Sequence, residues 1–432
     1  MKKFDFLTLG CKVNQYETEA MEEIFKQRGY CKSSDKDPAD VYVINTCTVT
    51  NMSDRKSRQY ISKAKKANPK ALIVVVGCYS QVAPEDIEGI EDVDVIMGTK
   101  NRAQIVDLVE LSKQTGEKIN VVGDFDKREV FDDLSISNDS NMDRAYIKIQ
   151  EGCNMFCTYC IIPYARGPIS SRKLEDIVEE AKRLAQNGYK ELILTGIHIA
   201  SYGKDLGGPF LIDAIEEVSK VKGIERIRLS SIEPKIITRD FLERLSKTKV
   251  CDHFHMSLQS GSNEILKAMN RKYSKEEYKE RVDLIREFYP DAGITTDIIC
   301  GFPGETDKLF EETMDFVDQV KFSKIHIFPF SRRKGTPAYS YKNQVKSDVK
   351  KARCHSLSEK EKMYRLDFLK KHIGMEKTVL FEKPTKDDGK MRGYTGNYLR
   401  VCLPCQEKFV KKIKKVRILD IEGDELIGTI VD

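Results

Sequence analysis

The sequence predicts an α/β protein that is built in three parts. Residues 1–122 alternate near-continuous apolar runs with helical segments, and residues 145–370 repeat this βα pattern through six further apolar runs. From residue 371 to residue 432 the pattern changes to short β-rich runs separated by glycine turns. We therefore expect a parallel α/β sheet domain, a partial (β/α)6 barrel and a small all-β barrel, with the polar residues 123–144 as a linker.

Length and composition exclude several classes of protein. At 432 residues the chain is too long for one ordinary core, and its 40% hydrophobic and 33% charged residues are typical of a folded globular protein. No apolar run approaches the roughly 18 residues that span a bilayer, and the start MKKFDFLTLGCK lacks the long apolar segment of a secretory signal. We expect a cytoplasmic protein without membrane contact, in which the 12 cysteines are free thiols or metal ligands.

The first part carries cysteines at the ends of three expected strands. Cys11, Cys47 and Cys78 follow the apolar runs in TLGC, INTC and VVGC. Parallel strands share one direction, so their carboxyl ends lie at one edge of the sheet, where open α/β sheets bind ligands. One such cysteine is usually a packing residue, but three on successive strands predict a common site. The expected strands are residues 4–10, 40–46, 71–77 and 94–98, with helices at 14–29 and 53–69.

The second part carries three cysteines directly after its first expected strand. Cys153, Cys157 and Cys160 are spaced C-x3-C-x2-C, unlike the paired C-x2-C of a zinc ribbon. Barrel enzymes place their active sites in the loops after the strands. Three thiolates from one loop can hold three irons of a [4Fe–4S] cluster and leave the fourth iron open for a substrate or cofactor. The expected strands are residues 145–150, 191–196, 226–231, 253–259, 294–301 and 324–331, with helices at 173–188 and 276–288.

The longer motif GCNMFCTYCIIPYARGPISSR resembles the radical S-adenosylmethionine (SAM) methylthiotransferases. The resemblance implies that the cluster on Cys153, Cys157 and Cys160 binds SAM, which one electron cleaves to release a 5′-deoxyadenosyl radical. It also implies that a second, auxiliary [4Fe–4S] cluster on Cys11, Cys47 and Cys78 carries the sulfur that is methylated and inserted. The segments LGCKVNQYETE, NTCTVT and GCYSQ match this pattern.

The residues around the first three cysteines bear on the substrate. GCKVNQYE with NTCTVT is most similar to the branch that acts on N6-threonylcarbamoyladenosine in tRNA, next to the anticodon. That resemblance implies two molecules of SAM, one that methylates the sulfur and one whose radical removes hydrogen from C2 of the adenine. The same chemistry on isopentenyladenosine in tRNA, or on an aspartate of a ribosomal protein, is the alternative.

The family resemblance also implies which side chains hold SAM and lie near the reaction. Tyr159 is expected against the adenine, and Gly196 is expected to allow close backbone approach. Glu233 and Gln259 follow the third and fourth barrel strands, and Asp297 points inward if its strand alternates regularly. Three arginines are candidate catalytic or substrate-near residues, although any one of them could instead form a surface salt bridge: Arg166, Arg172 and Arg271.

The third part resembles the TRAM domain, an RNA-binding β-barrel, in the segment GYTGNYLRV. Tyr398 and Arg400 lie in this segment, and the run KKIKK offers ammonium groups to RNA phosphates. A solvated, charged strand edge would account for the same lysines. The candidate RNA-binding residues are Tyr398, Arg400, Lys411, Lys412, Lys414 and Lys415.

Two other classes of protein are alternatives to this interpretation. A cobalamin-dependent radical methylase typically needs a histidine ligand in its first domain, and residues 1–140 contain none. A non-catalytic, metal-containing RNA-binding protein would need closed sites with four ligands, whereas each site here offers three. Cys402 and Cys405 form a C-x2-C without a second pair to complete a zinc site. The expected partners are tRNA, an external electron donor and an unidentified sulfur source, and the protein is expected to be a monomer.

Overall fold

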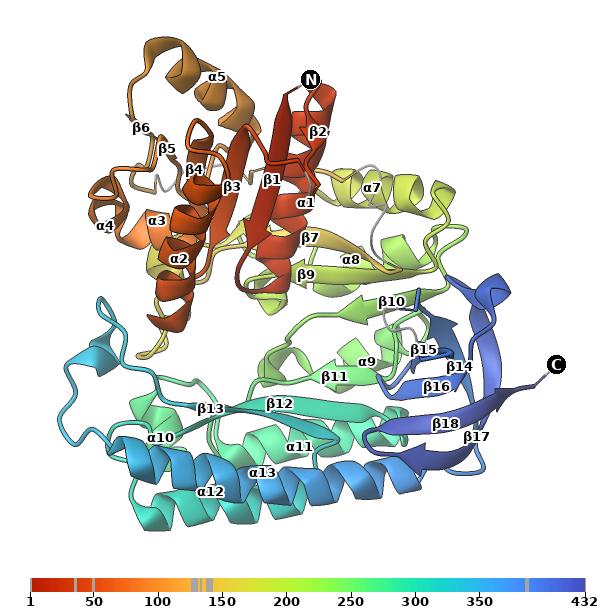
Figure 1. Ribbon diagram of the computed structural model, residues 1–432. Coiled ribbons are helices and arrows are strands. Elements are labelled where there is room, and N and C mark those ends of the chain that lie inside the picture. The colour runs from red at the N-terminus through yellow and green to blue at the C-terminus, as the bar shows by residue number, and fades with distance from the viewer. Residues whose placement is uncertain are drawn as a thin grey trace.

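Three structured parts follow one another along the chain (Figure 1). The structure is a computed structural model, and no helix in the part of the chain that it describes is long and apolar enough to cross a membrane. The expected linker lies partly outside the described residues, but its described residues Leu134 and Ile136 are buried. The described residues are 2–34, 37–48, 51–125, 131–132, 134–136, 143–384 and 388–431.

The N-terminal part is a parallel sheet with the strand order β2-β1-β3-β4-β5-β6. Its inner strands are near-continuous apolar runs because helices cover both faces of the sheet, which leaves one core cluster on each face. The strands are β1 Lys3–Thr8, β2 Cys31–Lys32, β3 Val41–Thr46, β4 Leu72–Gly77, β5 Val95–Ile96 and β6 Ile119–Asn120. The helices are α1 Lys12–Gln27, α2 Asn51–Ala67, α3 Cys78–Val82, α4 Pro84–Glu88, the 3-10 helix η1 Arg102–Gln104, and α5 Ile105–Thr115.

The central part is a partial barrel of six parallel strands. The order β8-β7-β9-β10 continues into β11-β12-β13 through the isolated parallel bridges Ile227–Val250 and Ile232–Met256. The short strand β8 pairs with β7 in the antiparallel direction and was not expected. The strands are β7 Ala145–Glu151, β8 Ser170–Ser171, β9 Glu191–Gly196, β10 Arg226–Leu229, β11 His253–His255, β12 Gly293–Cys300 and β13 Lys324–Pro329.

Helices between the barrel strands cover the outer face, and the long α13 packs across β13. The prediction of a strand over 253–259 was too long. The ladder of β11 stops at His255, and Gln259 rejoins β12 by a single bridge with φ at +76°. The helices are α6 Ile162–Arg166, α7 Leu174–Gln186, η2 Ile199–Ser201, α8 Leu211–Ser219, η3 Pro234–Ile236, α9 Arg239–Leu245, α10 Asn263–Ala268, α11 Lys275–Phe288, α12 Asp307–Val320, η4 Pro337–Tyr339 and α13 Ser347–Lys370.

The C-terminal part is a closed five-stranded barrel in the order β14-β15-β16-β18-β17. Inward-facing residues such as Val379, Met391 and Val416 alternate with more exposed ones and form its core. The predicted fold class, a parallel α/β domain, a partial barrel and a small all-β barrel, is confirmed. The elements are β14 Glu376–Phe381, β15 Lys390–Thr395, β16 Arg400–Pro404, η5 Glu407–Phe409, β17 Ile413–Glu422 and β18 Glu425–Ile430.

The central barrel holds the other two parts through specific contacts. Tyr16 and Ala20 of α1 pack with Tyr146 and Ile193 of the barrel strands, which brings the N-terminal part over β7 and β9. The C-terminal barrel is fixed at the amino end of β10, where Arg226, the first residue of the strand, donates to the carbonyls of Tyr394 and Thr378. The two smaller parts therefore meet around the interior of the central barrel.

Candidate functional site

The three N-terminal cysteines lie at the carboxyl ends of the adjacent strands β1, β3 and β4. Cys11 is exposed, whereas Cys47 and Cys78 are buried. Gly10 has φ at +112°, and a Cβ on this residue would lie only 2.7 Å from Cβ of Cys47 and 2.9 Å from its Sγ. Cys78 is within electrostatic range of both other thiols. The structure thus brings the three cysteines together at one edge of the sheet.

An arginine of the central barrel reaches this group of cysteines. Arg166, at the end of α6, donates from Nε to Sγ of Cys78 at 3.1 Å, and the same guanidinium bonds Glu17 and Glu151. Burial raises the pKa of the Cys78 thiol to about 12 in the metal-free protein. The thiol therefore has to lose its proton when a metal binds, and the neighbouring guanidinium stabilises the resulting thiolate.

The second group of cysteines lies in the tight loop after β7. Gly152 has φ at +70°, and a Cβ there would lie 1.8 Å from the carbonyl oxygen of Pro168, so only glycine allows this turn. Burial raises the pKa of Cys160 to about 12. Arg271 donates from Nη1 to Sγ of Cys157 at 3.4 Å, which gives this group its own arginine.

The chemistry of both groups fits an iron–sulfur cluster. Each group supplies three thiols, and an arginine N–H donates to one sulfur of each group. Next to the second group, Oε1 of Glu233 is buried without a hydrogen-bond partner, while Oε2 lies 3.5 Å from Nε2 of His198. A buried carboxylate oxygen without a donor fits the cationic amino group of a bound SAM.

The other expected cofactor residues surround the same strand ends. At Gly196 a Cβ would lie 2.8 Å from the carbonyl oxygen of Gln150, so this close approach needs glycine. The ring of Tyr159 packs edge-on against Phe302, with centroids 6.5 Å apart. Gln259 lies at the end of the fourth strand unit, and its backbone N–H donates to the carbonyl of Asp297.

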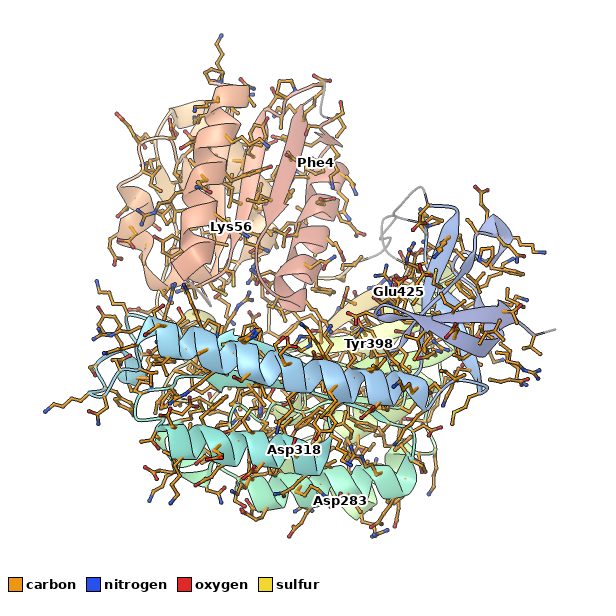
Figure 2. All side chains as sticks on the ribbon, turned by 60° about the horizontal axis from the view of Figure 1, so that its bottom comes forward. Phe4, Lys56, Asp283, Asp318, Tyr398 and Glu425 are labelled. Atoms are coloured by element: carbon orange, nitrogen blue, oxygen red, sulfur yellow. The ribbon has the colours of Figure 1, made fainter. Side chains whose placement is uncertain are left out.

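One cavity of about 820 Å³ joins the three parts of the protein. Its wall includes Cys11 of the first part, Gly196 and Asp297 of the central barrel, and Tyr398 and Arg400 of the C-terminal barrel. Figure 2 shows Tyr398 and Glu425, another residue of this wall, on the side of the C-terminal barrel that faces the centre of the molecule. Five residues singled out in the sequence therefore share one cavity, although they come from three domains.

The cavity wall also includes three histidines that were not predicted from the sequence, and two of them, His255 and His326, lie close to Asp297. Nε2 of His255 lies 3.2 Å from Oδ2 of Asp297, and the rings of His255 and His326 are 5.6 Å apart. The possible ligand atoms of His255, Asp297 and His326 lie within 4.8 Å of one another. The alternation used to place Asp297 inward would also have placed both histidines inward, because their neighbours on β11 and β13 point outward.

Other predicted residues have partners within the protein. Arg172 is buried in an ion pair with Glu180, away from the cavity. The ring of Tyr398 stacks on His253 and on Tyr394, each at 4.8 Å, and Arg400 pairs with Glu425.

The lysines of the C-terminal run differ in their surroundings. Lys411 lies over the ring of Tyr189, Lys414 lies over Phe409, and Lys415 pairs with Glu376. Lys412 is exposed. Lys412 is therefore the candidate of this run whose ammonium group is most open to an RNA phosphate.

Comparison with known proteins agrees with the fold, and the matched ranges include both groups of cysteines. Residues 147–317 match the radical SAM superfamily, and residues 3–98 match Uncharacterized protein family UPF0004. Among solved structures, the radical SAM methyltransferase TsrM from Kitasatospora setae shares 15% identity with a TM-score of 0.56, over 78% of this chain and 77% of that one, which shows a common fold. The fold and the C-x3-C-x2-C loop define a radical SAM enzyme, a class that uses SAM and a [4Fe–4S] cluster.

Curated relatives narrow the class. The chain is 42% identical to the threonylcarbamoyladenosine tRNA methylthiotransferase MtaB of Bacillus subtilis over 96% of its own length and 93% of the relative's. It is 43% identical to MtaB of Aquifex aeolicus over 88% and 92%. It is 36% identical to the tRNA-2-methylthio-N(6)-dimethylallyladenosine synthase of Carboxydothermus hydrogenoformans over 100% and 99%. The chain belongs to the radical SAM methylthiotransferase family.

Proposed function

We propose that this protein inserts a methylthio group at C2 of N6-threonylcarbamoyladenosine, next to the anticodon of tRNA. The relatives from B. subtilis and A. aeolicus, at 42% and 43% identity, are named for this nucleoside, and the relative named for dimethylallyladenosine is 36% identical. The observation that carries the proposal is the single cavity walled by Cys11, by the interior of the radical SAM barrel and by the TRAM-like barrel.

The six cysteines divide between two clusters in this proposal. Cys153, Cys157 and Cys160 hold the cluster that binds SAM, and Cys11, Cys47 and Cys78 hold the auxiliary cluster. A cluster with SAM supplies a carbon radical strong enough to remove hydrogen from an unactivated C–H bond, which acid–base side chains cannot do. Cys11 lies in the cavity wall, which supports a sulfur-carrying cluster within reach of a base bound in the cavity.

Residues of this chain bind and orient the reactants. Glu233 has a buried Oε1 without a hydrogen-bond partner, which would accept a hydrogen bond from the amino group of SAM. Arg166 and Arg271 each donate an N–H to a cysteine sulfur, which lowers the negative charge on the ligand. The C-terminal barrel contributes Tyr394 and Tyr398 to the cavity wall, so RNA bound on that barrel lies beside the reaction site.

An anaerobic assay tests the proposal. The iron-reconstituted protein, SAM, sulfide and dithionite are incubated with tRNA that carries threonylcarbamoyladenosine or isopentenyladenosine, and nucleosides are analysed by mass spectrometry. A methylthio group on the first nucleoside alone supports the proposal. A methylthio group on the second alone contradicts the substrate. Release of 5′-deoxyadenosine with neither tRNA modified points to a protein substrate.

The same assay separates the two proposed clusters. Cys153→Ala should abolish release of 5′-deoxyadenosine together with the modification. Cys47→Ala should abolish the modification while 5′-deoxyadenosine is still released. Loss of both products in both variants, each with its remaining cluster intact, would contradict the division of roles.

A further inference from the structure

The cavity carries positive charge that its own acids do not neutralise. Arg365 pairs with Asp424 at 3.3 Å, and Arg400 pairs with Glu425 at 3.1 Å. The charges of these two pairs cancel, so the ammonium groups of Lys12 and Lys324 and the carboxylate of Asp297 remain. The charged lining residues, apart from histidine, are Lys12, Lys324, Arg365, Arg400, Asp297, Asp424 and Glu425.

The remaining carboxylate is held by a histidine. His255 lies with Nε2 3.2 Å from the carboxylate of Asp297 and with Nδ1 2.8 Å from the hydroxyl of Thr295, which fixes the pair on β11 and β12. In the part of the chain that the structure describes, neither Lys12 nor Lys324 has a carboxylate within the 4.0 Å of an ion pair. Both ammonium groups therefore face the cavity without a counter-ion of their own.

Lys12 lies among like charges. It begins α1 directly after Cys11 and lines the cavity together with Tyr398, whose ring lies under the guanidinium groups of Arg144 and Arg228. Lys324 lies on β13, where Glu361 of α13 is within electrostatic range of its ammonium group. His326 is within electrostatic range of both lysines, which places them around one region of the cavity. An anion bound there would relieve the repulsion.

We propose that Lys12 and Lys324 form an anion subsite that receives the carboxylate of the threonyl group on the substrate adenosine. The proposal rests on the proposed function and adds the residues that select the substrate. A threonylcarbamoyl group ends in a carboxylate and a hydroxyl, whereas an isopentenyl group is apolar throughout. The wall also holds hydroxyl groups that suit the polar group: among the described residues, Oγ1 of Thr195 and Oγ of Ser230 are buried without a hydrogen-bond partner.

Binding of short RNAs to the iron-loaded protein tests the subsite. Anticodon stem-loops carry threonylcarbamoyladenosine, its methyl ester, isopentenyladenosine or unmodified adenosine, and their Kd values are measured anaerobically by fluorescence anisotropy. The wild type should bind the free acid about tenfold tighter than the ester, the effect of one charge-assisted hydrogen bond. Lys12→Gln and Lys324→Gln should each bring this ratio close to one, while Lys12→Arg retains it.

Controls separate the subsite from other effects. Lys113→Gln, an exposed lysine on α5 away from the cavity, should leave the ratio unchanged. The iron content of every variant is measured. If Lys12→Gln disturbs the cluster site at Cys11, the result for Lys324→Gln, whose residue follows no cysteine, decides whether the subsite exists.

Three results would overturn the inference. The first is a wild type that binds the acid and the ester equally. The second is that both glutamine variants retain the ratio. The third is that both variants bind all four RNAs more weakly by the same factor, as the loss of a phosphate contact would cause. If the wild type modifies threonylcarbamoyladenosine but fails this test, the proposed function stands without the subsite. If it modifies only isopentenyladenosine, both fail.

Discussion

Replacing Arg166 by methionine should destabilise the protein by about 3–5 kcal/mol, the cost of an uncompensated buried charge. Its guanidinium is fully buried and bonds Glu17 of α1 and Glu151 of β7, as well as Sγ of Cys78. These contacts join the N-terminal part to the barrel. Methionine fills a similar space but supplies neither the charge nor the donors.

The magnitude follows from the charges that remain. The ion pairs connect three cations with three carboxylates, and without Arg166 two cations face three carboxylates. Burial would raise the pKa of Glu151, but Lys148, Arg166 and Arg102 outweigh it and hold the pKa below its usual range. Lys100 adds a weaker attraction, so the lower end of the range is expected. The connected residues are Arg102, Lys148, Arg166, Glu17, Glu151 and Asp132.

Equilibrium urea unfolding, followed by circular dichroism at matched iron content, measures the loss. The control is Arg244→Met, which removes an equally well paired guanidinium from a half-exposed site, where Arg244 contacts Asp213 and Glu216. That variant should lose no more than about 1 kcal/mol because water replaces the lost contacts. If Arg166→Met loses no more free energy of unfolding than Arg244→Met, the buried network does not stabilise the protein as argued.

Three further predictions concern the clusters, the cofactor and pH. Cys153→Ala and Cys11→Ala should each lose about four irons per chain by elemental analysis; loss of all iron in either variant would contradict independent clusters. Glu233→Gln should weaken SAM binding about tenfold by equilibrium dialysis, at unchanged iron content, and an unaltered Kd would remove Glu233 from the SAM site. Burial would raise the pKa of Glu191, but nearby arginines, Arg228 most of all, lower it by more, so the pKa lies below its ordinary value. The ion pairs of Glu191 therefore stabilise the fold fully above the ordinary glutamate pKa of about 4.3. This stabilisation is lost as the pH falls from there through the lowered pKa of the folded state. Glu191→Gln should therefore cost about 3 kcal/mol at pH 7 and progressively less below pH 4 in urea unfolding, and a pH-independent loss would contradict this origin.

The local pattern of the sequence determined most of the fold and where the candidate site lies. Apolar runs that are buried on both faces predict parallel strands, and the shared direction of such strands is enough to bring Cys11, Cys47 and Cys78 to one edge. Alternation along a strand likewise places Asp297 inward, and spacing alone gathers the cysteines of the barrel loop. Each of these placements depends only on residues close in the chain or on the regular geometry of a strand or parallel sheet, so it can be predicted from the sequence.

Packing between distant segments decided the rest. Arg166 is next to the barrel cysteines in sequence, yet its Nε donates to Cys78 of the other group, because the docking of α1 and α3 against the barrel sets that contact. Tyr398 lies in a segment that resembles the TRAM domain, but its ring stacks on His253 at a domain interface. Lys12 is one more surface-like lysine in the sequence, and only the closure of three domains around one cavity leaves it without a carboxylate among the described residues. Such contacts depend on the angles at which whole domains pack, and no periodicity along the chain encodes those angles.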